Sequence, residues 1–379
     1  MFGGFKAKKG RCELCGKESD LVSDFLSLCL DCIRSEPSKA LRKSEALHGK
    51  AREESGLPVP SRENSEGIEC EYCAVNCSIA EGEKGYCGLS RNEDGRLIRE
   101  FGNSDKAIGS WYTDPHPTNC VSSWCCAGAT GSGYPEFAKT PEGDKGYRNA
   151  AVFLGSCCAH CLYCQNTDWH RMTSSGAPIL EKDELVEDLV ADESITCVCW
   201  FGGSPEPQAP FVYEVSKEIL DKVREDRIFR VGFEVNGNFA WKWLEKIAGL
   251  SLKSGGGIKF DLKAWDKNLY RVLTGIDPQP VFENFKKLEE YEKKRDEPPF
   301  LRASTLLVPG YIDLEEIRKI ARFISKVDTS IPYSLLSYAP AYKLDDQPRT
   351  KKDFALTAKN VAENEGLENV RIGNTHLLG

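Results

Sequence analysis

The sequence predicts an α/β fold, a partial or complete (β/α) barrel of parallel strands preceded by small cysteine-rich units that bind metal. Three observations predict it. From about residue 150 onward, apolar runs of strand length alternate with segments of helical periodicity. Many of the 17 cysteines gather in short clusters before and at the start of that alternation. The length of 379 residues is about twice that of an ordinary domain.

Seven apolar runs in the second part of the chain are the expected strands. They cover residues 150–155, 195–203, 229–235, 257–263, 301–308, 333–338 and 370–373. Helical periodicity separates most of them, for example at 184–190, 211–223 and 314–327. Such alternation implies parallel pairing through right-handed crossovers, in a barrel or, as the alternative, an open doubly wound sheet. In either fold the chemistry is expected at the carboxyl ends of the strands.

The cysteine spacing and the polarity of the chain divide it into four expected parts. Residues 1–34 form a zinc-ribbon-like unit and residues 35–67, which are polar and charged, a linker. Residues 68–149 form a cysteine-rich, irregular region, and residues 150–379 form the barrel.

Composition excludes several classes of protein. Hydrophobic residues make up 40% of the chain, too much for a disordered protein. The net charge of −8 argues against nucleic acid or an anionic membrane as the main partner. No apolar run approaches the roughly 18 residues of a membrane span, and no apolar core follows the basic start MFGGFKAKKG. We therefore expect a cytoplasmic protein whose clustered cysteines bind metal rather than form disulfides.

The segment GSCCAHCLYCQN directly follows the first expected strand. It contains Cys157, Cys161 and Cys164, three thiols that can hold three irons of a 4Fe-4S cube and leave the fourth iron open. A zinc knuckle or a few buried cysteines is the alternative. Using Cys158 instead gives a ferredoxin-like spacing, but that run lacks its fourth cysteine and proline, because Asp168 and Trp169 stand at those positions.

This segment, with Tyr163 before the third cysteine and Gln165 and Asn166 after it, resembles the radical S-adenosylmethionine (SAM) enzymes, especially relatives of the pyruvate formate-lyase activating enzyme. Three strand ends extend the resemblance: GGSPEP at 202–207, EVNG at 234–237 and DLK at 261–263. It covers about 150–379 and touches 70–95. The resemblance implies that SAM is bound by Tyr163, Gly202, Gly203, Glu206, Glu234, Asn236, Asp261 and Lys263. One departure is Ala339, where relatives commonly carry a histidine associated with the SAM ribose.

The residue types at these strand ends suit the charges of SAM, which carries a sulfonium, an ammonium and a carboxylate. Gly202 and Gly203 allow the main chain to approach a ligand closely and to offer backbone polar groups. The carboxylates of Glu234 and Asp261 can accept hydrogen bonds from the ammonium or the ribose. Lys263 can meet the carboxylate. An ion pair at a strand end is the simpler alternative for Asp261 and Lys263.

The resemblance also implies the reaction. A reduced 4Fe-4S cluster would cleave SAM to methionine and a 5′-deoxyadenosyl radical, which abstracts hydrogen from a substrate. That substrate is expected to be a protein or peptide, for example at a backbone glycine, and the electron donor a flavodoxin or ferredoxin. Another radical SAM chemistry on a peptide or a small molecule is one alternative. A non-enzymatic iron–sulfur or zinc protein is another, but it leaves the three strand ends unexplained.

The remaining cysteines fall into three groups. Four form a CxxC…CxxC set that suits a tetrahedral zinc ion: Cys12, Cys15, Cys29 and Cys32. A second set resembles the N-terminal cysteine motif of the same relatives and fits zinc, slightly favoured, or an auxiliary cluster: Cys70, Cys73, Cys77 and Cys87. Cys120, Cys125 and Cys126 are expected to be extra ligands or redox-active thiols, whereas Cys197 and Cys199 are expected to be small core residues.

Overall fold

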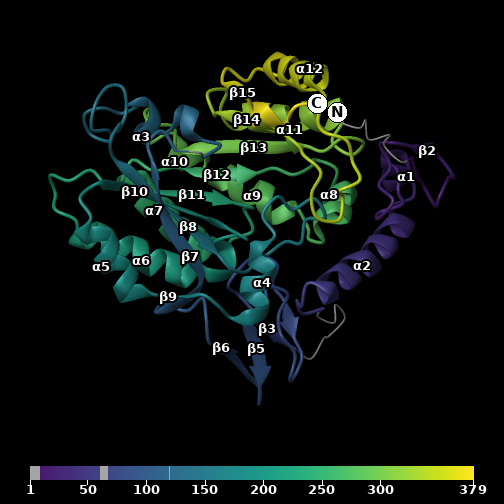
Figure 1. The fold of residues 1–379 in the computed structure, drawn as a ribbon, viewed down its shortest axis with the longest axis horizontal. Coiled ribbons are helices and arrows are strands. Elements are labelled where there is room, and N and C mark those ends of the chain that lie inside the picture. The colour runs from purple at the N-terminus through teal and green to yellow at the C-terminus, as the bar shows by residue number, and fades with distance from the viewer. Residues whose placement is uncertain (1–8, 60–66, 119) are drawn as a thin grey trace, which may run out of the picture.

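A nine-stranded sheet dominates the computed structural model of the protein, which describes residues 9–59, 67–118 and 120–379 (Figure 1). The strand order is β15-β14-β13-β12-β11-β10-β8-β7-β9. The strands are β7 (Lys106–Pro115), β8 (Arg148–Leu154), β9 (Ile179–Glu181), β10 (Ile195–Gly202), β11 (Arg230–Val235), β12 (Ile258–Asp261), β13 (Leu301–Leu307), β14 (Tyr333–Ser337) and β15 (Val370–Gly373).

Seven of these strands run parallel to their neighbours, from β8 through β10 to β15. Each corresponds to one of the runs that the sequence singled out. In the described part of the chain the two end strands, β15 and β9, do not pair with each other, so the sheet is an open, partial barrel. This confirms the expected α/β class and selects the partial form.

The sheet starts earlier than expected, because β7 lies in the segment predicted to be irregular. It pairs antiparallel with β8 on one side and with β9 on the other. Only Ala107, Ile108 and Gly109 are buried together, and most of the following residues are half-buried. Buried and exposed residues do not alternate along this strand, so the sequence lacks the alternation of apolar and polar residues that predicts a strand.

Helices connect the parallel strands and cover one face of the sheet. They are α4 (Asp168–Ser175), α5 (Lys182–Ala191), α6 (Ala209–Lys222), α7 (Trp241–Lys253), α8 (Lys267–Thr274), α9 (Gln279–Lys287), α10 (Glu289–Glu292), α11 (Leu314–Val327) and α12 (Lys352–Asn364). In α11 the Asp313 side chain accepts from the backbone N–H groups of Glu315 and Glu316 and so caps the helix. Its buried face includes Ile317 and Ile320, each of which stabilises the fold by about 1.5–3 kcal/mol through burial. No helix among the described residues is long and apolar enough to cross a bilayer.

Side chains alternate between the two faces of the sheet. On β10, Val198 and Trp200 are fully buried against the helices, and Trp200 Nε1 donates to Ser216 Oγ of α6 at 3.0 Å. On β12, Phe260 is likewise buried, while Lys259 and Asp261 point to the opposite face. The concave face is therefore polar, which leaves room for a charged ligand.

The expectation that residues 35–67 form a linker is wrong for most of the first half of this segment. Residues Pro37–Glu54 form helix α2, which contacts α8 (Figure 1). Its buried residues include His48, whose Nε2 lies 3.0 Å from the carbonyl oxygen of Val272, and Arg52, whose Nε donates to the carbonyl oxygen of Pro58. Because the buried face of α2 is partly polar, hydrophobic patterning underestimated how firmly it packs.

The N-terminal cysteine unit also packs on the barrel. It contains β1 (Gly10–Arg11), β2 (Glu18–Ser19) and α1 (Leu30–Ser35). The hydroxyl of Tyr311 accepts from the N–H of Ser23 at 3.1 Å, and Arg34 forms ion pairs with Asp313 and Glu316, both at 2.7 Å. The unit is therefore joined to the barrel by side-chain contacts as well as through the chain that connects them.

Two small hairpins carry the second cysteine set, with strands β3 (Ile68–Glu69), β4 (Ser78–Ile79), β5 (Ser90–Glu93) and β6 (Arg96–Arg99). The N–H of Ala74 donates to the carbonyl oxygen of Asn238 at 2.7 Å, just beyond β11. The hydroxyl of Ser156 donates to the carbonyl oxygen of Cys87 at 2.9 Å. This unit is thus attached to the carboxyl ends of β8 and β11.

Candidate functional site

A cavity of about 310 Å³ opens at the carboxyl ends of the parallel strands. Ten of the residues that the sequence singled out line it: Cys157, Cys161, Tyr163, Cys164, Gly202, Gly203, Glu234, Asn236, Asp261 and Lys263. They come from β10, β11 and β12 and from the loop after β8. The location agrees with the rule that parallel α/β sheets bind ligands at their carboxyl ends.

The loop that carries Cys157, Cys161 and Cys164 is fixed by main-chain hydrogen bonds. The N–H groups of His160 and Leu162 donate to the carbonyl oxygens of Thr274 and Leu273, both at 2.9 Å. Burial raises the pKa of the Cys161 thiol to about 12, so this sulfur is protonated until a metal displaces the proton. The three side chains therefore face one cavity from a rigid loop.

The sulfurs of Cys157, Cys161 and Cys164 do not all lie within 4.8 Å of one another. Within residues 9–59, 67–118 and 120–379, only the set at Cys12, Cys15, Cys29 and Cys32 has three or more candidate ligand atoms all within 4.8 Å of one another. Cys158, in contrast, does not line the cavity, is fully buried, and its sulfur lies 3.4 Å from Ser204 Oγ. The geometry groups Cys157, rather than Cys158, with the other two.

A network of ion pairs forms the wall made by β11 and β12. Lys259 Nζ lies 2.7 Å from Asp261 and 3.2 Å from Glu234, and Lys263 Nζ lies 3.2 Å from Asp261. Ser304 donates a further hydrogen bond to Asp261. Burial would raise the pKa of Asp261, but the two lysines hold it well below its usual value. Asp261 therefore stays ionised between the two lysines, and 34% of its side chain is still exposed.

Gly202 and Gly203 are required by close packing of β10 on β8. A side chain on Gly202 would place its Cβ 2.1 Å from the backbone nitrogen of Leu154, and the φ of +112° also favours glycine. A Cβ on Gly203 would lie 2.0 Å from the carbonyl oxygen of Ser156. The N–H of Gly203 already donates to the carbonyl oxygen of Leu154 at 2.8 Å, so close approach, rather than a free backbone donor, is what this glycine provides.

Glu206 is the one predicted SAM residue that does not line the cavity. It is fully buried, and its Oε1 accepts from the N–H of Gly237 at 2.7 Å. Burial raises the pKa of this carboxyl group. Glu206 therefore ties the end of β10 to the turn after β11, and in this segment Ser204 faces the cavity instead.

Other lining residues were not singled out by the motifs. Lys259 and Ser304 belong to the ion network, and Lys259 stands two positions before Asp261 on the same strand face. This spacing of two residues is the sequence signal that places Lys259 on the same face as Asp261. Neither Ala339 nor any of His160, His170 and His376 lines the cavity.

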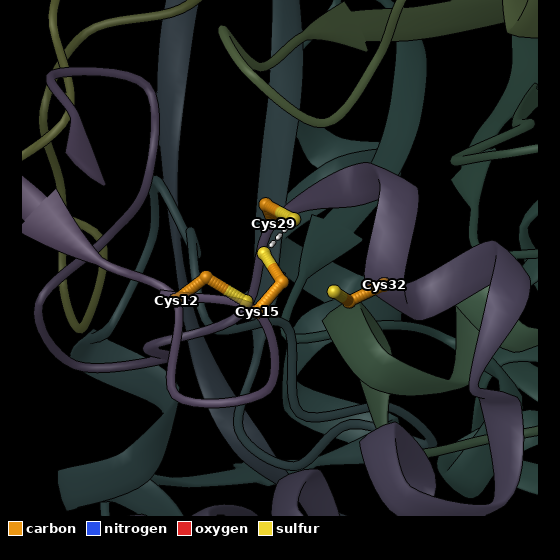
Figure 2. A group of neighbouring side chains, drawn as sticks. All are labelled: Cys12, Cys15, Cys29 and Cys32. Carbon is orange, nitrogen blue, oxygen red and sulfur yellow. Dashed lines mark hydrogen bonds between the residues drawn. The ribbon is translucent and has the colours of Figure 1, made fainter. Parts of the chain in front are cut away.

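The four N-terminal cysteines converge at one point (Figure 2). Cys12 and Cys15 come from the first knuckle, and Cys29 and Cys32 from the start of α1. All four sulfurs lie within 4.8 Å of one another, and those of Cys15 and Cys29 are 3.8 Å apart. Four thiols this close suit one tetrahedral ion.

The second cysteine set is buried but less compact. Cys73 interacts electrostatically with Cys70, Cys77 and Cys87, so the four thiols are neighbours. In the part of the chain that the structure describes, no three of their sulfurs lie within 4.8 Å of one another, unlike the sulfurs of the first set.

Comparisons with known proteins support the assignment of the barrel. Residues 152–324 match the radical SAM superfamily. An uncharacterized protein of Methanocaldococcus jannaschii is 24% identical over 81% of this chain and 81% of its own length. A second protein of that organism, named as a candidate glycyl-radical enzyme activating enzyme, is 31% identical over 38% of this chain and 52% of its own length.

Among solved structures, SuiB of Streptococcus suis bound to S-adenosylmethionine matches 58% of this chain and 49% of its own, with 14% identity and a TM-score of 0.41. The chain thus spans about half the length of SuiB and of the second relative. The profile match, the activating-enzyme relative and the cysteine loop agree on one family. Residues 152–324 are therefore assigned to the radical SAM superfamily, and part of the chain is similar to a relative named for activating a glycyl-radical enzyme.

Proposed function

We propose that the cavity binds SAM beside a 4Fe-4S cluster held by Cys157, Cys161 and Cys164. The observation that carries this proposal is that the three thiols and the ion network of Asp261 and Lys263 line the same cavity. When bound, the cluster supplies the electron that cleaves SAM to methionine and a 5′-deoxyadenosyl radical.

In this proposal the protein binds and orients the charged groups of SAM. Lys263 offers its ammonium to the SAM carboxylate, while Glu234 and Asp261 accept hydrogen bonds from the ammonium or the ribose. The two lysines are buried and already paired with carboxylates, so these groups need little reorganisation when a zwitterionic ligand enters. Phe153, Phe201 and Leu336 supply apolar surface in the same cavity, which excludes water from the reacting groups.

For the substrate we propose a protein or peptide, with hydrogen abstraction at a backbone glycine. Support comes from the motif resemblance and from the M. jannaschii relative named for activating a glycyl-radical enzyme. The alternative is another radical SAM chemistry on a peptide or small molecule, which uses the same cavity residues. A flavodoxin or ferredoxin is the proposed electron donor.

The other cysteine sets are proposed to hold separate metals. Cys12, Cys15, Cys29 and Cys32 would bind structural zinc, because their sulfurs are compact and coordinatively closed. Cys70, Cys73, Cys77 and Cys87 would bind zinc or an auxiliary cluster, and their wider spread favours the cluster. Neither set lines the SAM cavity.

SAM binding at the cluster is tested by electron paramagnetic resonance of the anaerobically reduced protein. Adding SAM should shift the signal of one 4Fe-4S cluster, and Asp261→Asn should require more SAM for the same shift. If saturating SAM does not change the signal of the reduced cluster, the proposal is refuted. To test the substrate class, the reduced enzyme is incubated with SAM and glycine-containing peptides. Deuterium transfer from an α-deuterated glycine to 5′-deoxyadenosine is the expected result.

A further inference from the structure

Five cysteines outside the sites described above lie on or over the concave face of the sheet. Cys197 and Cys199 stand on β10, and three more belong to the segment after β7: Cys120, Cys125 and Cys126. Because one residue separates Cys197 from Cys199, both side chains point away from the helices that bury Val198 and Trp200. Phe201 and Gly202, further along the same strand, line the SAM cavity, so the thiols lie directly beneath it.

Four of these thiols interact electrostatically, with Cys199 as the common partner. Cys199 interacts electrostatically with Cys197, Cys120 and Cys126, and Cys126 interacts with Cys197 as well. Cys120 Sγ donates to Glu234 Oε1 at 2.8 Å, and Glu234 is part of the cavity wall. Cys125 Sγ donates to the carbonyl oxygen of Ser122, as Cys126 Sγ does to that of Ser123. The fifth thiol, Cys125, differs in that Cys126 is the one thiol with which it interacts strongly.

The segment that carries three of these cysteines is anchored to the sheet at two points. Arg230 of β11 forms a buried ion pair with Asp144 at 2.6 Å and donates to the carbonyl oxygen of Phe137 at 2.7 Å. Trp124 Nε1 donates to Ser334 Oγ of β14 at 3.0 Å. The thiols are therefore held over the sheet by the fold itself.

A buried arginine faces these thiols without an ion-pair partner. Arg302 of β13 is 7% exposed, and in the described part of the chain no carboxylate lies within 4.0 Å of it and its Nε has no hydrogen-bond partner. The groups that interact with it most strongly are the thiols of Cys125, Cys126, Cys120 and Cys199. Glu292 is within electrostatic reach, but burial raises the pKa of that carboxyl to about 7. A buried cation of this kind calls for a nearby anion.

The spread of the thiols indicates the kind of group that they could hold. No three of them fall within 4.8 Å of one another, in the described residues, which also holds for Cys157, Cys161 and Cys164. The zinc-like set at the N-terminus is the compact exception. A polynuclear cluster separates its thiolates further than a single ion does, and thiolates formed on binding would neutralise Arg302.

We propose that Cys120, Cys126, Cys197 and Cys199 hold an iron–sulfur cluster beneath the SAM cavity, distinct from the cluster at Cys157, Cys161 and Cys164. Arg302 balances its negative charge. His116, whose Nε2 lies 3.5 Å from Cys197 Sγ, donates a hydrogen bond to the ligand sulfur. This site is independent of how SAM is cleaved, so it goes beyond the proposed function.

The test compares Cys126→Ala and Cys199→Ala with the matched control Cys125→Ala in the full-length protein. After anaerobic reconstitution, each of the first two should contain about two to four fewer irons than wild type, with a matching loss of sulfide. Cys125→Ala should keep the wild-type content. The SAM-responsive paramagnetic signal should persist in all three, which separates this site from the proposed SAM cluster.

Wild-type iron and sulfide content in both Cys126→Ala and Cys199→Ala would overturn the proposal. Equal iron loss in Cys125→Ala would overturn the ligand assignment. Cys126 lies on a loop and is partly exposed, so its replacement leaves the sheet intact and keeps the test valid should Cys199→Ala not fold.

Discussion

Asn236 Nδ2 donates to Cys157 Sγ at 3.2 Å, which links the end of β11 to the first cysteine of the cluster loop. The same amide lies 3.6 Å from the sulfur of Cys158. Hydrogen bonds to ligand sulfurs orient them and raise the reduction potential of a cluster. Asn236 and Cys157 both line the cavity while Cys158 does not, so the amide contacts the cysteine that faces the SAM site.

This arrangement predicts which of the two adjacent cysteines binds iron. Cys157→Ala should lose the SAM-responsive 4Fe-4S signal after anaerobic reconstitution, as should Cys161→Ala and Cys164→Ala. Cys158→Ala should keep it, because Cys158 is fully buried and, unlike Cys157, does not line the cavity. Loss of the signal in Cys158→Ala together with its retention in Cys157→Ala would reverse the assignment.

The ion network predicts the effect of removing one charged partner. Lys263→Ala leaves the partly buried Asp261 with one lysine instead of two and removes the group proposed for the SAM carboxylate. Truncating such a pair costs about 2–5 kcal/mol, which corresponds to a tens-fold to thousand-fold weaker binding of SAM. Isothermal titration of the reconstituted protein measures this, with iron content as the control. Unchanged affinity in Lys263→Ala would remove Lys263 from the binding site.

The compact cysteine set predicts that zinc stabilises the whole chain. Metal analysis of the wild-type protein should find about one zinc ion at this site. The Cys12→Ser variant should lack this ion. Because Tyr311 and Arg34 join the unit to the barrel, losing zinc should also lower the melting temperature of the barrel. Full zinc occupancy in Cys12→Ser, or a melting temperature unaffected by its loss, would contradict this account.

Glu292 predicts a pH-dependent stability. Burial raises its pKa from 4.5 to about 7, and its carboxyl accepts from the N–H of Leu301. Below pH 4.5 both the folded and unfolded chains hold this proton; as the pH rises to about 7 the unfolded chain alone releases it, so stability falls. The loss is roughly 3 kcal/mol in this interval.

The variant Glu292→Gln should lack that component, since an amide also accepts from Leu301 but does not ionise. Urea unfolding midpoints of wild type and variant at pH 5 and pH 8 provide the measurement. From pH 5 to pH 8, the stability of the variant should increase relative to that of the wild type. A difference that is the same at both pH values would show that Glu292 does not titrate as described.

The parallel strands and most of the cavity could be predicted from the sequence, for a clear reason. Each buried strand is an apolar run, and each ends in a short polar motif such as the one containing Asp261 and Lys263. Position at the end of a parallel strand is enough to place such residues at one edge of the sheet. Hence ten of the eleven predicted cluster and SAM residues line one cavity.

Features that depend on tertiary contacts could not be predicted in this way. Helix α2 buries His48 and Arg52, whose polarity is typical of a solvent-exposed segment. Glu206 resembles a ligand-binding residue in the sequence, but it lies outside the cavity and accepts a hydrogen bond from the N–H of Gly237. Cys199 looks like a small core residue, and only the fold brings it to the thiols of the segment after β7.

The most direct test of the central claim is the product of the reduced enzyme with SAM alone. The account predicts that anaerobic, strongly reduced protein releases methionine and 5′-deoxyadenosine in equal amounts, measured by liquid chromatography. Cys157→Ala should release neither, whereas Cys158→Ala should stay close to wild type. A wild-type protein that holds its full complement of iron and sulfide, yet forms no 5′-deoxyadenosine under these conditions, would contradict the account.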